Sequence, residues 1–208
     1  MSNIMSNSTL QFYNQNAKQF ADSTLQVDMS AVYGEFLPHV MPQGHILDAG
    51  CGSARDAAYF KQQGFQVSAF DASAEIAKLA TEHLGQPVEV KTFQQLKDQQ
   101  RYDGIWCCAS LLHVPKRELS EVFLNLQNAL KAEGVLYVSF KYGTEERRHN
   151  DRLFTDLDEA ALMNLIAHCP SLTLVKHWQS QDQRPERSHE IWLNAIIKKS
   201  PSCADAAC

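Results

Sequence analysis

Short apolar runs alternate along the chain with longer segments whose apolar positions repeat every three or four residues. The apolar runs have the length of strands and cover residues 45–49, 65–70, 88–91, 102–109 and 135–141. The fourth run is nearly continuous in apolar residues, which is typical of a sheet buried on both faces. The segments between them predict helices over residues 54–63, 73–83 and 118–131, the last one closed by Gly134. This alternation predicts an α/β fold with a doubly wound sheet.

The segments at either end extend this pattern. Helical spacing over residues 12–20 and 29–40 precedes the first strand, and a helix over residues 157–168 follows the fifth. Residues 172–179 and 190–198 read as two strands joined by a polar stretch. We expect this last pair to add an antiparallel edge. The prediction is a Rossmann-like, mostly parallel seven-stranded sheet with an antiparallel C-terminal strand.

Length and composition limit the remaining choices. A chain of 208 residues with 44% apolar and 21% charged residues is ordinary for one globular domain, which we place at residues 10–199. We expect residues 1–9 to be flexible and residues 200–208 to be disordered. The net charge of −5 leaves no general electrostatic footprint for nucleic-acid binding, so a nucleic-acid partner is disfavoured.

Targeting and redox signals point to a cytoplasmic location. No apolar run approaches the length of a membrane span, and the first residues lack the pattern of a secretory signal, so we expect no membrane association. The six cysteines include no Cys-x-x-Cys pair, which indicates neither a zinc site nor a disulfide framework. This usage fits a reducing compartment. We expect a monomer or a homodimer without a bound metal.

The loop after the first strand carries the strongest functional signal. Asp48 is followed by a Gly-x-Gly turn at Gly50 and Gly52, and Asp71 ends the next strand. A glycine turn lets a ligand approach the backbone, and a carboxylate at the next strand end can accept hydrogen bonds from a ribose diol. The two strand ends therefore predict a nucleoside cofactor site.

The details of this loop argue against a dinucleotide. That fingerprint needs a third glycine, and Arg55 occupies its position. A pyrophosphate would also be repelled by the carboxylate of Asp48, and the chain has no P-loop. A carboxylate beside the turn suits a positively charged ligand, such as the ammonium and sulfonium groups of S-adenosylmethionine.

With these residues the chain resembles the class I S-adenosylmethionine-dependent methyltransferases, from about residue 12 to about residue 199. Their first motif is an acidic residue followed by Gly-x-Gly-x-Gly, and their second is the acidic residue that ends strand two. Segments 110–115 and 139–143 place the chain near the small single-domain type, tellurite-resistance-like or methyltransferase type 11-like. Ala54 stands where the family often has its third glycine, and we expect its methyl group to be tolerated on a right-handed backbone.

The resemblance implies roles for residues at each strand end. The first loop lets the cofactor approach the backbone, the second strand end holds the ribose, and the loop after the third strand holds the adenine, with Phe93 stacked on the ring. The backbone of the segment after the fourth strand, residues 109–115, lines the methionine end, and the loop that follows it faces the substrate. Thr92 and Gln94 replace the aspartate that many members use there. The cofactor-binding residues implied are Tyr13, Asp48, Ala49, Gly50, Cys51, Gly52, Arg55, Asp71, Ala72, Thr92, Phe93, Ala109 and Ser110.

Several of these residues keep two interpretations. Asp71 can bind ribose, cap the following helix, or do both. Phe93 can equally belong to the core, and Arg55 can pair with the methionine carboxylate or with a surface acid. Tyr13 can close over the cofactor as a lid or pack as an ordinary helix residue. His113 is the candidate catalytic residue, a general base or else a histidine that packs its loop.

A basic cluster follows the fifth strand and suggests an anionic methyl acceptor. Its candidate substrate-binding residues are Tyr142, Arg147 and Arg152, and Arg184 and Arg187 in the last hairpin loop would join them at the same edge. The alternative is a solvated loop in which these arginines pair with acidic residues at positions 145, 146, 151 and 186.

The function predicted is S-adenosylmethionine-dependent methylation of a small molecule, anionic or chalcogen-containing, with S-adenosylhomocysteine as the other product. The methyl group is already activated, so the enzyme mainly aligns the reactants in line and keeps water out. Two alternatives remain open. One is a tRNA wobble-uridine methyltransferase whose arginines at 147–152 meet phosphate, and the other is a non-catalytic cofactor-binding module that regulates a partner.

Overall fold

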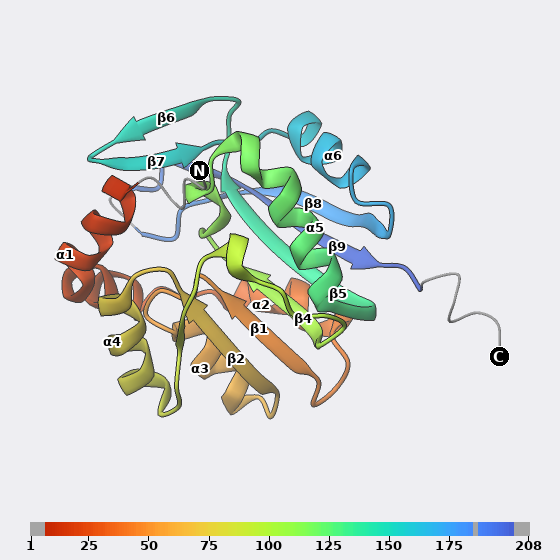
Figure 1. Cartoon of the computed structure of the whole chain (residues 1–208), viewed down its shortest axis with the longest axis horizontal. Coiled ribbons are helices and arrows are strands. Elements are labelled where there is room, and N and C mark those ends of the chain that lie inside the picture. The colour runs from red at the N-terminus through yellow and green to blue at the C-terminus, as the bar shows by residue number, and fades with distance from the viewer. Residues whose placement is uncertain (1–6, 185–186, 202–208) are drawn as a thin grey trace.

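The computed structural model of the chain describes residues 7–184 and 187–201. The segments 1–6 and 202–208, which we predict to be flexible and disordered, lie outside the described residues. A seven-stranded sheet runs through the molecule (Figure 1) in the order β3-β2-β1-β4-β5-β9-β8. In that order the strands are Glu89–Val90, Gln66–Asp71, His45–Ala49, Tyr102–Cys107, Leu130–Lys141, Ile191–Lys199 and Leu172–Gln181.

Strands β1 to β5 are parallel, β9 runs antiparallel to β5, and β8 pairs antiparallel with β9. The predicted Rossmann-like sheet with its antiparallel C-terminal strand is confirmed. The strand order reverses between β1 and β4, which places a crevice at their carboxyl ends. The helices and 3₁₀ turns are α1 (Asn7–Thr24), α2 (Ser30–Phe36), η1 (Leu37–His39), α3 (Arg55–Gln62), α4 (Ala74–Leu84), η2 (Phe93–Gln95), η3 (Leu111–His113), η4 (Lys116–Glu118), α5 (Leu119–Ala129) and α6 (Glu159–Ala167).

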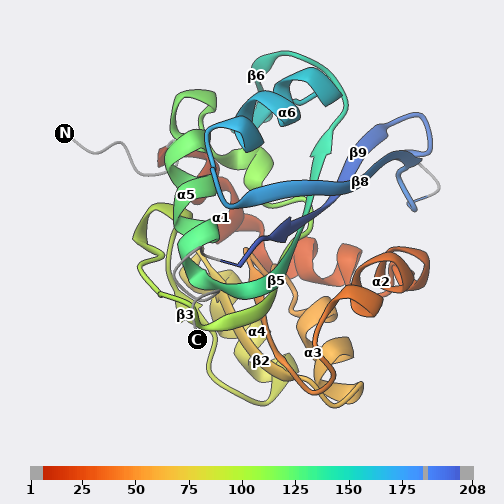
Figure 2. The ribbon, with the colours of Figure 1, turned by 90° about the vertical axis from the view of Figure 1, so that its right-hand side faces the viewer.

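Helices cover both faces of the sheet (Figure 2). On one face α2 and α3 bury Phe36 and Phe60 against Trp106 of β4 and Tyr137 of β5. On the other face α5 and α6 pack with the apolar side chains of β4, β5 and β9. Because both faces are covered, the central strands read as apolar runs rather than as an alternating pattern. No helix of the described residues is both long enough and apolar enough to cross a membrane.

Helix α1 begins earlier than predicted. The helix starts at Asn7, inside the segment expected to be flexible, so that boundary is wrong. Thr9 is fully buried, and its Oγ1 accepts a hydrogen bond from the backbone N–H of Leu153 at 2.9 Å. Polar composition alone predicted fraying because this tertiary partner is far away in the sequence. Helix α1 lies beside α4 and β7 (Figure 1), over the carboxyl ends of the first strands.

The predicted end of the 118–131 helix at Gly134 is also wrong. Helix α5 ends at Ala129, and β5 begins at Leu130 and runs through Gly134. A Cβ on this glycine would lie 2.9 Å from the carbonyl oxygen of Lys131 and 3.2 Å from that of Tyr102. The pairing register of β4 and β5 shifts at this point. Gly134 therefore allows a close backbone approach at a bulge, which in sequence looks like a helix-closing glycine.

A hairpin made of β6 (Glu146–His149) and β7 (Arg152–Thr155) was not predicted. Its strands are short and one of them is entirely polar, so no apolar periodicity reveals it. Its turn residues, Asn150 and Asp151, have φ of 48° and 61°, as in the two-residue turns that join tight hairpins. The hairpin lies next to α1 and supplies part of the site.

Candidate cofactor and acceptor site

Two adjoining cavities open at the carboxyl ends of the parallel strands, beneath α1. We call them the small cavity and the large cavity. The small cavity is bordered by the loops after β2, β3 and β4, and the large one by the loops after β1 and β4 and by β5, β7 and the β8–β9 hairpin. The residues that line both cavities are Tyr13, Phe20, Gly50, Gly52, Ala109 and His113.

The glycine turn after β1 forms part of the wall between them. Gly50 has φ of +72°, and a Cβ added to it would lie 2.6 Å from the Cβ of Ser110. The backbone N–H groups of Gly50 and Cys51 donate to the carbonyl oxygen of Phe70 at 2.9 and 3.0 Å, while Ser110 Oγ donates to the carbonyl of Ala49 at 2.8 Å. The turn is thus tied to β2 and to the β4 loop, and only glycine fits at position 50.

Asp71 joins the two predicted motifs. Its Oδ2 accepts from the backbone N–H of Gly52 at 3.1 Å, and its Oδ1 accepts from that of Ser73 at 2.9 Å. Ser73, not Asp71, is the N-cap of α4. Burial raises the pKa of the Asp71 carboxyl to about 6. Each carboxylate oxygen can accept a second hydrogen bond, so Asp71, which lines the small cavity beside Ala72, keeps acceptor capacity for hydroxyl groups there.

Asp48 faces inward rather than into open solvent. The residue is 2% exposed, and its Oδ2 accepts from the backbone N–H of Ala57 in α3 at 3.1 Å. Burial, together with the nearby carboxylate of Asp56, raises the pKa of Asp48 well above its usual range. Asp48 lines the large cavity and also fixes the first turn of α3. Ala54, the N-cap of that helix, has a left-handed backbone with φ of 58°, so the right-handed backbone on which its expected tolerance depended is not present.

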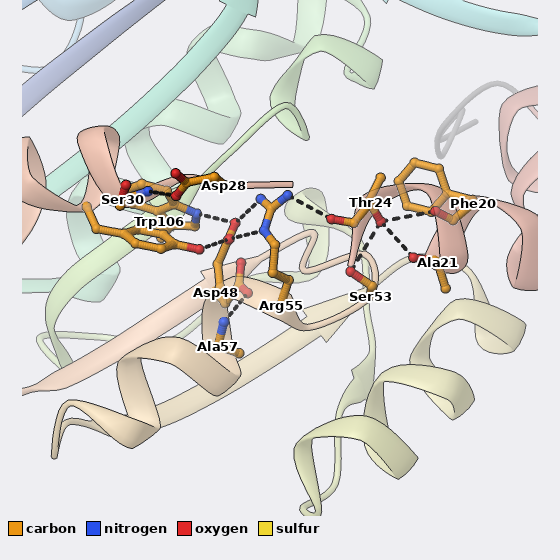
Figure 3. A network of polar contacts seen from close by, with 12 residues as sticks. Phe20, Ala21, Thr24, Asp28, Ser30, Asp48, Ser53, Arg55, Ala57 and Trp106 are labelled. Atoms are coloured by element: carbon orange, nitrogen blue, oxygen red, sulfur yellow. Dashed lines mark hydrogen bonds and ion pairs between the residues drawn. The ribbon is translucent and has the colours of Figure 1, made fainter. Parts of the chain in front are cut away.

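Arg55 is paired with its own neighbour in a buried polar network (Figure 3). Its Nε and Nη2 donate to Asp56 at 2.6 and 2.9 Å, and its Nη1 donates to the carbonyl oxygen of Thr24 at 3.1 Å. The same carboxylate accepts from the hydroxyl of Tyr33 at 2.5 Å and from Trp106 Nε1 at 2.8 Å. The acid that pairs with Arg55 is therefore a buried one, 5% exposed, and not a surface residue. The network ties the end of α1 to α2, α3 and β4.

The predicted adenine residues surround the small cavity. Phe93 is 4% exposed and packs edge-on against Phe70, with ring centroids 5.3 Å apart. Its ring belongs to the core and also lines the cavity, so the two interpretations are compatible. Thr92 lines the same cavity, and its backbone N–H donates to Gln95 Oε1 at 2.9 Å.

Tyr13 and His113 meet above the junction of the two cavities. The Tyr13 hydroxyl lies 2.8 Å from His113 Nε2, and His113 Nδ1 lies 2.7 Å from the carbonyl oxygen of Leu153. His113 is 5% exposed. The structure brings together the lid candidate and the catalytic candidate, which the sequence assigned to unrelated roles.

The three substrate-binding candidates do not lie at one site. Tyr142 is 42% exposed, donates to Glu159 Oε2 at 3.0 Å, and does not belong to the described lining of either cavity. Arg147 is also absent from that lining and pairs with Asp156 at 2.8 Å. Arg152 alone of the three lines the large cavity. The unpredicted hairpin explains why Arg152 lines the cavity and Arg147 does not, because the two arginines lie on different strands of it.

Arg152 is held by aromatic faces. Its guanidinium lies 4.4 Å from the ring centroid of Phe12 and 5.1 Å from that of Phe154. Its Nε is buried and has no hydrogen-bond partner among the described residues. Lys141, Arg184 and Arg187 line the same cavity.

Sequence comparison matches part of the chain to a protein family. The family described as "methyltransferase domain" matches residues 46–134, the segment that carries both acidic motifs. YqeM of Bacillus subtilis is 27% identical over 154 residues, which cover 62% of this chain and 61% of that protein. The ubiquinone biosynthesis O-methyltransferase of Rickettsia typhi is 32% identical over 100 residues, 45% of this chain and 39% of that protein. These matches support a class I S-adenosylmethionine-dependent methyltransferase domain over residues 46–134.

Most of the chain shares its fold with a methyltransferase of known structure. The 1,6-didemethyltoxoflavin-N1-methyltransferase of Burkholderia thailandensis, solved with 1,6-didemethyltoxoflavin and S-adenosylhomocysteine, superposes with a TM-score of 0.77. The likeness covers 93% of this chain and 88% of that one at 21% identity, and so concerns the fold alone. The chain spans only about 61% and 39% of the lengths of these two curated relatives.

Sequence reasoning missed several residues that line the large cavity. Ser139 of β5 accepts a hydrogen bond from the backbone N–H of Ala109 at 2.8 Å and lines the large cavity, as do Cys108, Trp192 and Asn194. The first two stand at the carboxyl ends of predicted strands, which was an available signal. For Trp192 and Asn194 on β9 there was no such signal, because nothing in their local sequence tells which face of the final hairpin lines the cavity.

Proposed function

We propose that this protein transfers a methyl group from S-adenosylmethionine to a small molecule. The observation that carries the proposal is the link between the two motifs: the hydrogen bond from Gly52 N to Asp71 sets the glycine turn and the carboxylate side by side at the wall between two cavities. A nucleoside would occupy the small cavity, and a methionine chain passing Gly50 and Gly52 would enter the large one. The sulfonium group would supply an activated methyl.

The described residues fit this ligand. Asp71 would accept hydrogen bonds from the ribose, and Phe93 would pack against the adenine. Gly50 leaves room for a backbone approach that any side chain would block. Tyr13 and Phe20 of α1 line both cavities and would shield the reacting atoms from water. The adjacency of the cavities supports in-line alignment of the two ligands, which stays a proposal.

The large cavity is a candidate for an anionic acceptor. Four cationic side chains other than Arg55 line it, and two of them are neutralised: Lys141 pairs with Glu190 at 2.7 Å and Arg184 with Asp182 at 2.5 Å. The buried Nε of Arg152 supports binding of a carboxylate or similar anion, because an unpaired buried donor is costly and a ligand oxygen would satisfy it. No observation favours a chalcogen acceptor over other anions.

The tRNA alternative loses two of the three arginines that supported it. It relied on Arg147, Arg148 and Arg152 as a cationic surface for phosphate. Arg147 is neutralised by Asp156, and Arg152 lies between two phenylalanine rings at the large cavity. The name of the Rickettsia relative, an O-methyltransferase of ubiquinone biosynthesis, supports a small-molecule acceptor. The cytoplasmic location and the monomeric or dimeric state stay predictions.

Calorimetric titration with S-adenosylmethionine, S-adenosylhomocysteine and NADH tests the cofactor. We expect micromolar binding of both adenosyl ligands and no binding of NADH. A second assay follows transfer of a labelled methyl group from S-adenosylmethionine into small molecules. Binding without any transfer would favour the regulatory-module alternative, and binding of NADH alone would refute the proposal.

The affinity for S-adenosylhomocysteine should depend on pH through Asp71. The pKa of its carboxyl is about 6 in the free protein, and hydroxyl donors of a ribose favour the ionised form. Affinity should therefore be full above about pH 7 and should fall as the pH decreases through 6, by up to about tenfold per pH unit. Titrations between pH 5 and 8 measure this.

Asp71→Asn is the control for that series. The amide has no titrating proton and only one acceptor oxygen. Its affinity should be flat with pH and weaker at neutral pH by about 1.5–3 kcal/mol, the usual effect of losing a charged hydrogen bond. A wild-type affinity that does not change between pH 8 and 5 would exclude Asp71 as the ribose acceptor.

A further inference from the structure

The tautomer of His113 follows from its two partners. A carbonyl oxygen can only accept, so His113 Nδ1, 2.7 Å from the Leu153 carbonyl, carries the proton. In a neutral ring Nε2 is then the acceptor, and the Tyr13 hydroxyl, 2.8 Å away, donates to it. The lone pair of Nε2 therefore points toward the side chain of Tyr13.

The surroundings keep this pair neutral. Burial lowers the pKa of His113 to about 4, and the cations Arg152 of β7 and Lys141 of β5 act in the same direction. Burial raises the pKa of Tyr13, while the nearby Arg152 acts against that rise. Above about pH 5 the pair thus consists of a phenol and a neutral imidazole. Its Nε2 carries no proton and can accept one from the Tyr13 hydroxyl.

The position of the pair suggests more than packing. Both side chains line both cavities, at the junction where the glycine turn and Ala109 also lie. The Leu153 carbonyl satisfies only Nδ1 of His113, and the ring packs against Phe154, whose centroid lies 5.0 Å away. The Nε2–hydroxyl contact adds a proton path from the junction into a buried base.

We propose that Tyr13 and His113 together accept the proton that the methyl acceptor loses, and that the acceptor is accordingly a hydroxyl or N–H compound. The inference rests on the proposed methyl transfer. It distinguishes this class from thiolates and chalcogen anions, which arrive without a proton to lose.

The proton and electron balance is closed within the site. A lone pair of the acceptor oxygen or nitrogen forms the new bond to the methyl carbon, and the carbon–sulfur bond breaks with its electrons on sulfur. The acceptor proton moves to Tyr13 Oη as the Tyr13 proton moves to His113 Nε2. The sulfonium charge disappears as the imidazolium charge appears, so the net charge of the cavities is unchanged.

This charge balance compensates for a weak base. A pKa near 4 would make proton transfer unfavourable if the imidazolium formed beside a sulfonium. Because the sulfonium is neutralised in the same step, the imidazolium replaces the sulfonium as the cation of the site, and the two positive charges do not coexist. The contribution should lie at the lower end of the range for general bases, about 100-fold.

Three variants distinguish a general base from a structural latch, by which we mean a histidine that only holds Tyr13 in place through a hydrogen bond. His113→Gln offers an amide oxygen that can still accept from Tyr13 but cannot take a proton. His113→Asn keeps an N–H for the Leu153 carbonyl and removes the Nε2 position. Tyr13→Phe removes only the shared hydroxyl. If the pair acts as a base, all three should lower kcat by about 100-fold while S-adenosylhomocysteine affinity stays within a few-fold of wild type.

The assay uses labelled S-adenosylmethionine with a protein-free small-molecule extract of bacterial cells, and locates the label in the products. Label on oxygen or nitrogen that falls in all three variants supports the inference. Label on sulfur, selenium, tellurium or carbon overturns it. So does full activity in His113→Gln, the result expected of a latch.

A second readout needs no turnover. Nitrogen NMR of the histidine-labelled protein should show His113 as the Nδ1–H tautomer at pH 7, with no titration above about pH 5, and a shifted Nε2 resonance in Tyr13→Phe. An Nε2–H tautomer or an imidazolium at pH 7 overturns the inference. Failure of wild-type protein to bind the cofactor or to transfer any methyl group would instead refute the proposed function itself, and the inference with it.

Discussion

Gly50→Val is expected to abolish binding of S-adenosylhomocysteine in a protein that still folds. Gly50 has φ of +72°, and its Cβ would meet Ser110 Cβ at 2.6 Å and a ring carbon of Phe93 at 3.6 Å. The valine must therefore displace the β4 loop or fill the space that a ligand backbone would use. We expect calorimetric affinity to fall by more than about 100-fold, or about 2.8 kcal/mol.

Gly85→Val is the matched control. Gly85 closes α4 with φ of +66°, and no atom lies within 4 Å of its added Cβ. This variant carries the same side chain on a similar backbone, so it should lose stability through strain, about 1–2 kcal/mol, while keeping its affinity. Thermal unfolding of both variants measures the strain. Equal loss of binding in both would trace the effect to general destabilisation, and retained binding in folded Gly50→Val would contradict the assigned site.

The strand-end residues could be predicted because they need only local information. In a parallel sheet all carboxyl ends meet at one edge, so Asp48, Gly50 and Asp71 had to lie near each other once the strands were located. Their detailed roles were less accessible. Asp48 turned out to cap α3 from within, because burial favours a backbone N–H partner over an exposed ligand contact.

The lid and the acceptor side needed tertiary information. Tyr13 and His113 are 100 residues apart, and nothing in their local sequences predicts contact. The basic cluster was visible, yet its members divide between cavity and solvent according to their register in a short hairpin. A shift of one residue in a strand moves every side chain to the opposite face, and polar strands give no apolar pattern to fix that register.

Asp56→Ala is expected to destabilise the fold strongly. The carboxylate is 5% exposed and accepts hydrogen bonds from Arg55, Tyr33 and Trp106. Its loss leaves a buried guanidinium without its ion-pair partner and leaves two further donors unsatisfied. Breaking a buried pair in this way costs about 3–5 kcal/mol. Urea unfolding monitored by tryptophan fluorescence measures the change.

Asp22→Ala provides the comparison, because Asp22 also pairs with a cation at 3.1 Å but on the surface of α1. The side chains of Lys18 and Asp22 are 83% and 65% exposed, so this substitution should change stability by less than about 0.5 kcal/mol. Similar unfolding curves for the two variants would contradict the role assigned to the buried network. A large difference would support that role. Arg55 also holds the carbonyl of Thr24 and thereby the end of the helix that carries Tyr13. Asp56→Asn, which keeps the shape of the side chain, should then retain more stability than alanine and still loosen that helix.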